Sequence, residues 1–365
     1  MESDFVREII HVNILGNSYD ITIDKDLIAN VGLEIKKIYS GDKIAIVTDN
    51  NVDKIYGARV FDSLINAGFN VYKIVIPAGE KSKCFKVLQK VYEELIAFQI
   101  NRGNMIIALG GGVVGDLAGF AASTFLRGIP YTQMPTSLLA QVDSSIGGKV
   151  AVDLSQGKNL VGSFYQPRAV FIDTQVLETL PERFLYDGMG EVIKYGAFKD
   201  KDLFKLLLSL NSKEELLENI GVIIKACCLI KRDIVEIDEK DMGDRMLLNF
   251  GHTIGHAIEK IHNYEVFSHG EAISIGMYAI TRRSEELGIT QRGASEGLKE
   301  ILEKYELPIS FKGQKETVSS IVSSISGDKK NIGKKMNIIL LNSIGDGFIK
   351  AIYQNEIDDY ISLDY

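Results

Sequence analysis

The sequence predicts an α/β fold: a mostly parallel sheet in the N-terminal part, then a mostly helical C-terminal part. In the first half, short β-branched runs alternate with helical windows, which is typical of strands joined by crossover helices. From about residue 181 long helical windows dominate. A chain of 365 residues is also long enough for two domains. We therefore expect an α/β domain over residues 1–178 and a helical domain over residues 179–365, with the cleft between them as the default site.

Hydrophobic periodicity predicts the individual elements. Apolar side chains three and four positions apart predict a helix over residues 86–98. Strands are predicted over residues 43–47 (KIAIV), 71–76 (VYKIVI), 105–109 (MIIAL) and 169–172 (AVFI). In the second half, helices are predicted over residues 189–198, 203–210, 213–231, 245–261 and 271–287, with short strands over 336–341 and 348–352.

Composition excludes several classes of protein. Hydrophobic residues at 45% and charged residues at 25% match a globular chain. A net charge of -8 argues against nucleic-acid or anionic-membrane partners, which a negative field does not attract. Cys84, Cys227 and Cys228 cannot all pair and lack zinc-knuckle spacing, and the first ten residues contain no signal-peptide core. We therefore expect a reduced, cytoplasmic protein.

A glycine cluster at residues 110–116 (GGGVVGD) follows the predicted strand 105–109 and opens a predicted helix. Glycines let the backbone approach a phosphate, and the helix N-terminus supplies N–H groups and positive dipole. The cluster matches G-x-G-x-x-G, but it departs from the Rossmann-like fingerprint because no acid follows about twenty residues on. Asp49, after the first predicted strand, is the acid that would hold a ribose. The alternatives are a tight turn at the glycines and an ordinary strand-end residue at Asp49.

Histidines and a carboxylate suggest a metal site. His252 and His256 are four residues apart on a predicted helix and so share one face. His269 follows shortly, and Glu191 lies on an earlier predicted helix. Imidazole and carboxylate ligands suit zinc, and three protein ligands with an open position would make the site catalytic. Spacing alone favours His252 and His256 as the ligand pair.

The alternative for each histidine is a structural hydrogen-bonding role. We expect that role for His11 and His262. The other histidines all fall within residues 252–269, and this crowding favours a metal site.

Basic and polar residues beside glycines or apolar residues suggest an anion site. An acidic protein needs such local positive charge to bind an anionic ligand. The alternative is a set of solvated surface charges, and Asp143 either balances them or caps the following turn. The residues are Arg127, Lys149, Lys158, Asn159, Lys194, Lys231, Arg245 and Asn249.

Six motifs taken together resemble those of 3-dehydroquinate synthases, in the same order. They are LGGGVVGDLAGFAAS, PTSLLAQVDSSIGGKVAVD, GKNLVGSF, GEVIKYG, LLNFGHTIGHAIE and SHGEA. The resemblance runs from about Asp49 to Lys330 and covers most of the chain. No single motif is decisive, but six long motifs in register are specific.

The resemblance implies a sugar phosphate cyclase of the shikimate pathway that converts 3-deoxy-D-arabino-heptulosonate 7-phosphate to 3-dehydroquinate and phosphate. In that chemistry NAD+ transiently oxidises a hydroxyl, phosphate is eliminated, the ketone is reduced again, the ring opens and an aldol step closes the carbocycle. It also implies one divalent ion, Zn2+ with Co2+ as the alternative, held by Glu191, His252 and His269. His256 then becomes a phosphate contact and not a ligand.

The resemblance further assigns cofactor and substrate contacts and a homodimer, in which Arg127 reaches the neighbouring subunit's phosphate site. Lys231, Arg245 and Asn249 are expected to grip the substrate carboxylate and hydroxyls, and Lys329 or Lys330 to join the phosphate cluster. The implied NAD+ contacts are Asp49, Asn51, Glu80, Lys83, Gly112, Val113, Val114, Gly115, Asp116, Thr136, Ser137, Lys149 and Lys158. The implied substrate contacts are Arg127, Asp143, Lys149, Asn159, Lys194, Lys231, Arg245, Asn249 and His256.

The sequence departs from the family pattern in two places, and three other functions are alternatives. The chain carries one residue more between the ligand histidines than some relatives, and its tail at 354–365 matches nothing in the family pattern. A cyclase for a neutral sugar phosphate, a metal-dependent polyol dehydrogenase and an inactive nucleotide-binding regulator are the alternatives. The carboxylate-gripping residues favour an acid substrate over the first of these.

Overall fold

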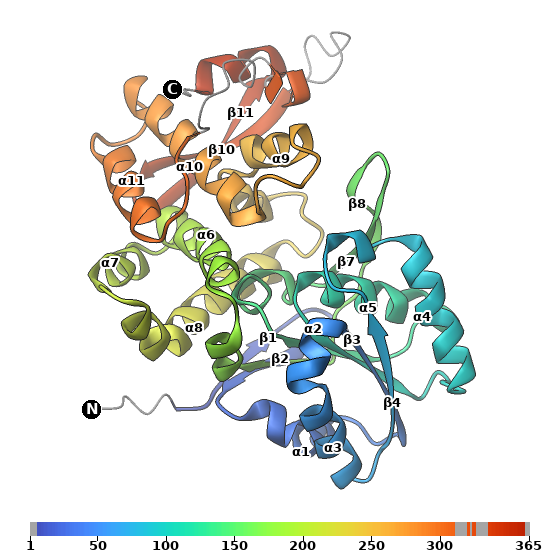
Figure 1. Ribbon diagram of the computed structural model, residues 1–365. Helices are drawn as coiled ribbons and strands as arrows, with labels where there is room; N and C mark the ends of the chain where they lie inside the picture. The colour runs from blue at the N-terminus through green and yellow to red at the C-terminus, as the bar shows by residue number, and fades with distance from the viewer. Residues whose placement is uncertain (1–5, 311–319, 322, 326–334, 362–365) are drawn as a thin grey trace. The chain divides into compact units, whose positions relative to one another are not determined.

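The computed structural model describes residues 6–310, 320–321, 323–325 and 335–361 (Figure 1). The chain divides into two compact units. Unit 1 comprises Met1–Pro181 and Leu217–Glu236, and unit 2 comprises Glu182–Leu216 and Ile237–Tyr365. The sequence predicted a single domain boundary at residue 178, and this boundary stays a prediction. In the structure the segment Leu217–Glu236 groups with the N-terminal unit.

Unit 1 is built on a seven-stranded sheet with the order β1-β2-β9-β6-β5-β3-β4. Every neighbouring pair is parallel except β1 with β2, so the predicted mostly parallel sheet is confirmed. Strand β5 is buried at every position, as expected for a parallel strand covered on both faces. The strands are β1 (Glu8–Val12), β2 (Tyr19–Asp24), β3 (Lys43–Asp49), β4 (Asn70–Ile76), β5 (Met105–Gly110), β6 (Tyr131–Pro135) and β9 (Ala169–Asp173).

All four strands predicted for the first half are confirmed as β3, β4, β5 and β9, but three sheet strands were missed. The hairpin of β1 and β2 carries His11 and Asp20 at exposed positions, and β6 (YTQMP) contains a proline and a glutamine. Gln133 is nevertheless buried within β6. The glycine cluster therefore follows the fifth strand of the chain, not the third.

Helices and a small hairpin complete unit 1. Helix α5 packs against β5, β6 and β7. A Cβ at Gly119 would lie 2.4 Å from Cγ1 of Val150, so this glycine allows the close approach of α5 to β7. Leu117 of α5 is fully buried in the core, which contributes roughly 1.5–3 kcal/mol. The elements are α1 (Leu27–Ile38), α2 (Asn50–Val52), α3 (Ala58–Asn66), α4 (Phe85–Ala97), α5 (Gly112–Thr124) and most of α8 (Lys213–Ile237), with β7 (Lys149–Leu154) paired to β8 (Gly157–Phe164).

Unit 2 is mostly helical, and the two short strands predicted near the end of the chain are found, paired as an antiparallel hairpin. One predicted element was wrong: the window 245–261 is not a single helix. A 3-10 segment, Asp244–Asn249, is separated from α9 by Gly251, whose φ of +79° breaks the helix. The elements are α6 (Glu182–Phe198), α7 (Lys201–Ser209), α9 (His252–Ile261), α10 (His269–Glu286), α11 (Ala294–Lys304), β10 (Lys335–Ser343) and β11 (Asp346–Tyr353).

None of the helices within the described ranges has both the length and the apolar character needed to span a bilayer. The strand predicted over residues 105–109 and the helix predicted to open at the glycine cluster are found as β5 and α5.

Candidate active site

Three helices of unit 2 bring a carboxylate and two imidazoles together. Glu191 lies in α6 and is fully buried, while His252 and His269 are the first residues of α9 and α10. Oε1 of Glu191 lies 3.3 Å from Nε2 of His252 and 3.1 Å from Nε2 of His269. The ligand atoms of all three lie within 4.8 Å of one another. This donor set fits Zn2+ and leaves a fourth coordination position for a ligand.

The two histidines are placed by the starts of their helices. The left-handed backbone of Gly251 directly precedes α9, which puts His252 in the first helical position. Ser268 caps α10 through a capping box with Glu271: its side chain accepts the N–H of Glu271, whose carboxylate accepts the N–H of Ser268 at 2.7 Å. His269, the next residue, is thereby fixed at the helix start.

A close contact between α6 and α10 brings Glu191 to His269. A Cβ at Gly190 would lie 2.7 Å from Cα of Gly270, so only glycine permits this approach. The N–H of Gly270 donates to Oδ1 of Asp187 at 2.6 Å, which ties the N-terminus of α10 to α6. Glu191 and His269 are the chain neighbours of these two glycines.

Glu191 is ionised and His252 is neutral in this group of side chains. Burial by itself would raise the pKa of Glu191, but Lys194, His252 and His269 hold that pKa well below its ordinary value. Burial, with Lys194, lowers the pKa of His252, so this ring is neutral at pH 7. Its Nδ1 lies 3.1 Å from the carbonyl of Phe250; when Nδ1 carries the proton, Nε2 presents its lone pair.

His269 differs from His252 in its protonation. Burial alone would lower its pKa, but Glu191 and Glu259 raise it to about 10. A metal ion that binds here therefore displaces a proton from this ring, as is usual for histidine ligands.

A cavity of about 200 Å³ in unit 2 is lined in part by His252 of the candidate metal-binding group. The His252 and His256 ring centroids are 5.2 Å apart, and His256 lies outside the Glu191, His252 and His269 group. The pair chosen from spacing alone therefore does not share that group. The cavity is lined by Met246, Asn249, His252, Thr253, His256, Asn337 and Ile339.

Several lining residues carried no signal in the sequence. Asn337, on β10, donates from Nδ2 to Sδ of Met246 at 3.2 Å. An asparagine in a short C-terminal strand has no motif around it, so only the fold identifies it. The predicted phosphate-binding residues Lys329 and Lys330 lie outside the described residues.

Two predicted cationic residues of unit 2 are buried. Lys194 is 1% exposed and forms an ion pair with Glu191, and Arg245 is 2% exposed. The compensating charge of Lys194 is the carboxylate of Glu191, whereas the buried guanidinium of Arg245 is suited to an anionic partner. The N–H of Arg245 donates to Oδ2 of Asp238 at 3.2 Å, which holds this residue at the start of the 3-10 segment.

In unit 1 the predicted cofactor residues gather at one edge of the sheet. The strands β6, β5, β3 and β4 are parallel neighbours, so their carboxyl ends meet there. The chain passes from β3 to β4 and then to β5 on the other side of β3, which makes this edge a topological switch point, the usual place for a ligand. The predicted residues that follow these four strands are Asp49 and Asn51, Glu80 and Lys83, Gly112, Val113, Val114, Gly115 and Asp116, and Thr136 and Ser137.

At the end of β3, Asp49 has the structural role considered as an alternative, and at the end of β5 the start of α5 has N–H groups outside its helical ladder. Oδ1 of Asp49 accepts the N–H of Asn51 at 2.8 Å and of Val52 at 3.1 Å, so Asp49 caps α2. The first helical bond of α5 runs from Gly115 N–H to Gly111, which leaves the earlier N–H groups outside the helical ladder. Those groups are the ones that bind phosphate in such helices.

A charged cluster links three segments at this edge. Nζ of Lys83, which is 5% exposed, lies 3.0 Å from Glu80, 3.2 Å from Asp116 and 3.8 Å from Asp153. Burial raises the pKa of Asp116 to about 6, although Lys83 opposes the shift. Lys158 lies 3.8 Å from Glu80. Asp153 was not predicted, because a single aspartate in a strand carries no spacing signal.

The other predicted residues of unit 1 are placed as follows. Nζ of Lys231 lies 2.7 Å from Oδ1 of Asp143, so Asp143 balances a cation as one interpretation expected. Asn159 has a φ of +56° and donates its N–H to Asp153 at 2.8 Å. Lys149 begins β7 with its side chain exposed, and Arg127 is exposed in a 3-10 turn with a φ of +69°.

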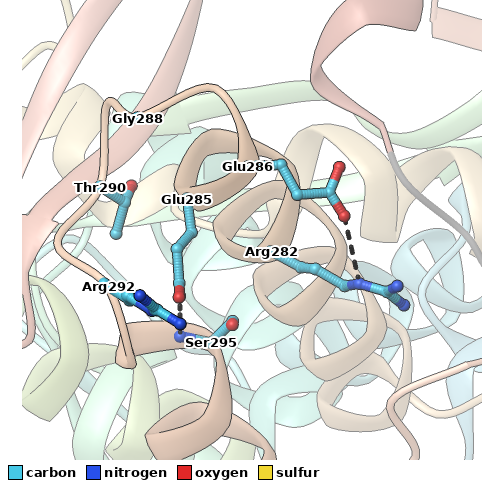
Figure 2. A pocket seen from close by; sticks show the side chains of 7 residues that line it. All are labelled: Arg282, Glu285, Glu286, Gly288, Thr290, Arg292 and Ser295. Atoms are coloured by element: carbon cyan, nitrogen blue, oxygen red, sulfur yellow. Dashed lines mark hydrogen bonds and ion pairs between the residues drawn. The ribbon is translucent and has the colours of Figure 1, made fainter.

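A larger surface cavity of about 530 Å³ contains none of the predicted residues (Figure 2). Three of its charged side chains have partners: Arg282 pairs with Glu286 at 3.4 Å, and Glu285 accepts the N–H of Ser295 at 2.9 Å. Arg282 lies thirteen residues after His269 on α10, about 20 Å along the helix. This cavity is therefore separate from the metal cluster.

Comparison with known proteins agrees with this arrangement. The family models for the 3-dehydroquinate synthase N-terminal and C-terminal regions match residues 73–187 and 188–331. A curated 3-dehydroquinate synthase from Clostridium acetobutylicum is 55% identical over 345 residues, which is 94% of this chain and 96% of that protein.

Two solved structures share the fold. A 2-deoxy-scyllo-inosose synthase complexed with carbaglucose-6-phosphate, NAD+ and Co2+ has a TM-score of 0.83 and 26% identity, covering 97% of this chain and 98% of its own. A 2-epi-5-epi-valiolone synthase from Streptomyces hygroscopicus subsp. jinggangensis 5008 with NAD+ and Zn2+ has a TM-score of 0.84, 24% identity and coverage of 95% and 96%. Because two consecutive family models match and identity reaches 55% over nearly the whole chain, the chain belongs to the 3-dehydroquinate synthase family of the sugar phosphate cyclase superfamily.

Proposed function

We propose that this chain closes 3-deoxy-D-arabino-heptulosonate 7-phosphate into 3-dehydroquinate, with release of phosphate, using tightly held NAD+ and one Zn2+ ion. The observation that carries the proposal is the convergence of Glu191, His252 and His269 around one point. A chain 55% identical to a curated 3-dehydroquinate synthase supports the choice of substrate. The solved cyclases with NAD+ and Co2+ or Zn2+ support the choice of cofactors.

The ion and NAD+ divide the chemistry between them. When bound, the ion supplies a Lewis acid for a substrate hydroxyl, and NAD+ supplies a reversible hydride acceptor. The protein's share is to position these groups and the sugar and to neutralise charge. We propose Glu191, His252 and His269 as the metal ligands, and the N–H groups of Gly112, Val113 and Val114 as donors to the cofactor's pyrophosphate.

Cationic and polar side chains then hold the substrate. We propose that Arg245 and Asn249 contact its carboxylate and hydroxyls, and we assign Lys231 to the same ligand. Lys194, buried beside Glu191, places a positive charge where the substrate oxygen becomes negative. His256, which lines the 200 Å³ cavity, is proposed as the phosphate contact.

Phosphate release tests the function. Purified chain is given the heptulosonate phosphate with substoichiometric NAD+, and released phosphate is measured before and after treatment with a chelator. We expect many turnovers per NAD+, loss of turnover with the chelator and recovery with added Zn2+.

A neutral substrate separates this proposal from the main rival. Glucose 6-phosphate lacks the carboxylate, and a cyclase for neutral sugar phosphates would release phosphate from such a substrate. Phosphate release from glucose 6-phosphate, with none from the heptulosonate phosphate, would contradict our assignment of the substrate.

We also propose a homodimer in which Arg127 reaches the neighbouring subunit's phosphate site. The exposure of Arg127 supports this, since a residue that contacts another subunit must be accessible on the surface of its own chain. Mixing an Arg127→Ala chain with an Lys194→Ala chain tests it, because dimers with one intact site should restore part of the activity. The cytoplasmic location stays a prediction.

A further inference from the structure

Glu259 is a buried carboxylate that the proposed mechanism does not use. It lies in α9, seven residues after His252 and so on the same face of the helix. The residue is 3% exposed. Burying an ionised carboxylate destabilises the fold unless a partner compensates its charge. The groups around Glu259 therefore indicate its role.

The ring of His269 lies between two carboxylates. Nε2 of His269 is 3.1 Å from Oε1 of Glu191, and Nδ1 is 3.5 Å from Oε2 of Glu259. The first nitrogen belongs to the metal cluster and the second faces away from it. Each imidazole of the cluster thus has its own partner at Nδ1: a backbone carbonyl for His252 and Glu259 for His269.

We propose that Glu259 is a positioning residue that sets the orientation and tautomer of His269 for metal binding. The proposal rests on the proposed metal site and deepens it. With the proton on Nδ1 directed at Glu259, Nε2 carries the lone pair that a metal ion needs, and the nearby negative charge makes that nitrogen a stronger donor. Helix α9 therefore supplies one ligand at its first residue and the support of the other ligand two turns later.

A second arrangement of the same residues competes with this one. The ligand atoms of His256, Glu259 and His269 also lie within 4.8 Å of one another, so these three residues form a candidate site of their own. In that arrangement Glu259 would be a ligand, and a chain loaded at both sites would carry two ions. One bound ion per chain is the result that our proposal requires.

The variants Glu259→Gln and Glu259→Ala test the proposal through metal binding. Glutamine keeps the shape and an oxygen acceptor but loses the charge, whereas alanine removes the contact. Glu303→Gln on α11 is the control, because Glu303 is exposed on a helix without proposed ligands. The metal-free chains are titrated with Zn2+ against a chromogenic chelator, and the Co2+-loaded chains are compared by their visible absorption spectra.

We expect about 10- to 100-fold weaker Zn2+ binding in Glu259→Ala, a smaller loss in Glu259→Gln and none in Glu303→Gln. The Co2+ spectrum of both Glu259 variants should change, because that spectrum reports the ligand geometry. Thermal unfolding of the metal-free chains shows whether each variant is folded. The isosteric Gln variant keeps the test available if the Ala variant fails to fold.

Three results would overturn the proposal, and each has a different meaning. If the wild-type chain binds one Zn2+ and both variants bind it with the same affinity and the same Co2+ spectrum, Glu259 has no positioning role while the metal site stands. If the wild-type chain binds no Zn2+ stoichiometrically, the metal site of the proposed function fails as well. Two ions per wild-type chain would also overturn the proposal, in favour of Glu259 as a ligand.

Discussion

Lys194 and Arg245 are cations placed where water cannot reach them. They are 1% and 2% exposed, and burying a charged group lowers the free energy of unfolding. We propose that an anionic substrate, when it binds, compensates part of this destabilisation. Burial of this kind is a feature of ligand sites more than of surfaces. It is the strongest residue-scale support for the predicted anion site.

Arg245→Ala should lower turnover by about 100-fold or more, because it removes a charged donor from the proposed substrate carboxylate. Circular dichroism should show an intact fold. Steady-state phosphate release measures the effect, with Arg232→Ala, which alters an arginine that pairs with its neighbour Asp233, as the control. Near-normal turnover in Arg245→Ala would show that the carboxylate assignment is wrong.

Glu34 gives the protein a predictable acid sensitivity. Hydrogen bonds from Arg7 at 3.0 and 2.8 Å, opposed by burial and aided by Lys37, lower the pKa of Glu34 to about 2 from 4.5. Below pH 4.5 the carboxylate of Glu34 is protonated in the unfolded chain but stays ionised in the folded chain. The free energy of unfolding therefore decreases as the pH falls toward 2.

Glu34→Gln should therefore unfold about 1–2 kcal/mol more easily at pH 7, with the difference vanishing toward pH 2. Urea unfolding at several pH values measures this, with the exposed Glu300→Gln as the control. A difference between wild type and Glu34→Gln that stays constant from pH 7 to pH 2 would contradict the account.

At the residue scale the sequence predicted the ligand types but not their partners. Spacing alone paired His252 with His256, because one helix face is visible in a sequence and the packing of three helices is not. Only the family resemblance selected Glu191 and His269. Glu259 was missed because its burial is invisible in a helix that also carries ordinary surface charges.

At the scale of elements, the predicted strands of the parallel sheet were found because each is a short, apolar, β-branched run. The strand β6 was missed because Gln133 and Pro135 interrupt its apolar pattern. Thr136 and Ser137, which were predicted as cofactor contacts, directly follow this strand. The window 245–261 was predicted as one helix because apolar periodicity continues across Gly251. A single positive φ ends that helix, and periodicity does not report φ.

Gly251→Ala should destabilise the chain by about 1–3 kcal/mol and weaken metal binding. The alanine backbone would have to keep a φ of +79°, which L-residues rarely adopt, and its Cβ would lie 2.5 Å from Cγ of Met277. The start of α9 and His252 must therefore shift. Thermal unfolding and Zn2+ titration measure the two effects.

Gly297→Ala on α11 is the matched control. The added Cβ meets nothing within 4 Å, and Gly297 has no left-handed backbone, so this variant should be neutral or slightly more stable. Equal behaviour of the two variants would show that the backbone break at Gly251 does not place His252.

At the scale of the whole molecule, the fold alone does not select the reaction. Cyclases for other sugars share this fold at TM-scores of 0.83 and 0.84, whereas sequence identity reaches 55% with a 3-dehydroquinate synthase. The sequence alone showed six motifs in the same order as in 3-dehydroquinate synthases. The spatial convergence of side chains from α6, α9 and α10 required the structure.

A cyclase and a dehydrogenase differ in what happens to NAD+. If the hydride is returned in every cycle, absorbance at the NADH wavelength should show no net rise while phosphate accumulates. Both signals can be followed in one reaction with the heptulosonate phosphate. Stoichiometric NADH release would contradict a cyclase and favour a polyol dehydrogenase.

The central claim is that Glu191, His252 and His269 hold one metal ion. Anomalous diffraction from crystals of the Zn2+-loaded protein tests it most directly. The account predicts one anomalous peak about 2.0–2.2 Å from a carboxylate oxygen of Glu191 and from Nε2 of both histidines. A peak at other residues, or no peak in fully loaded protein, would contradict it.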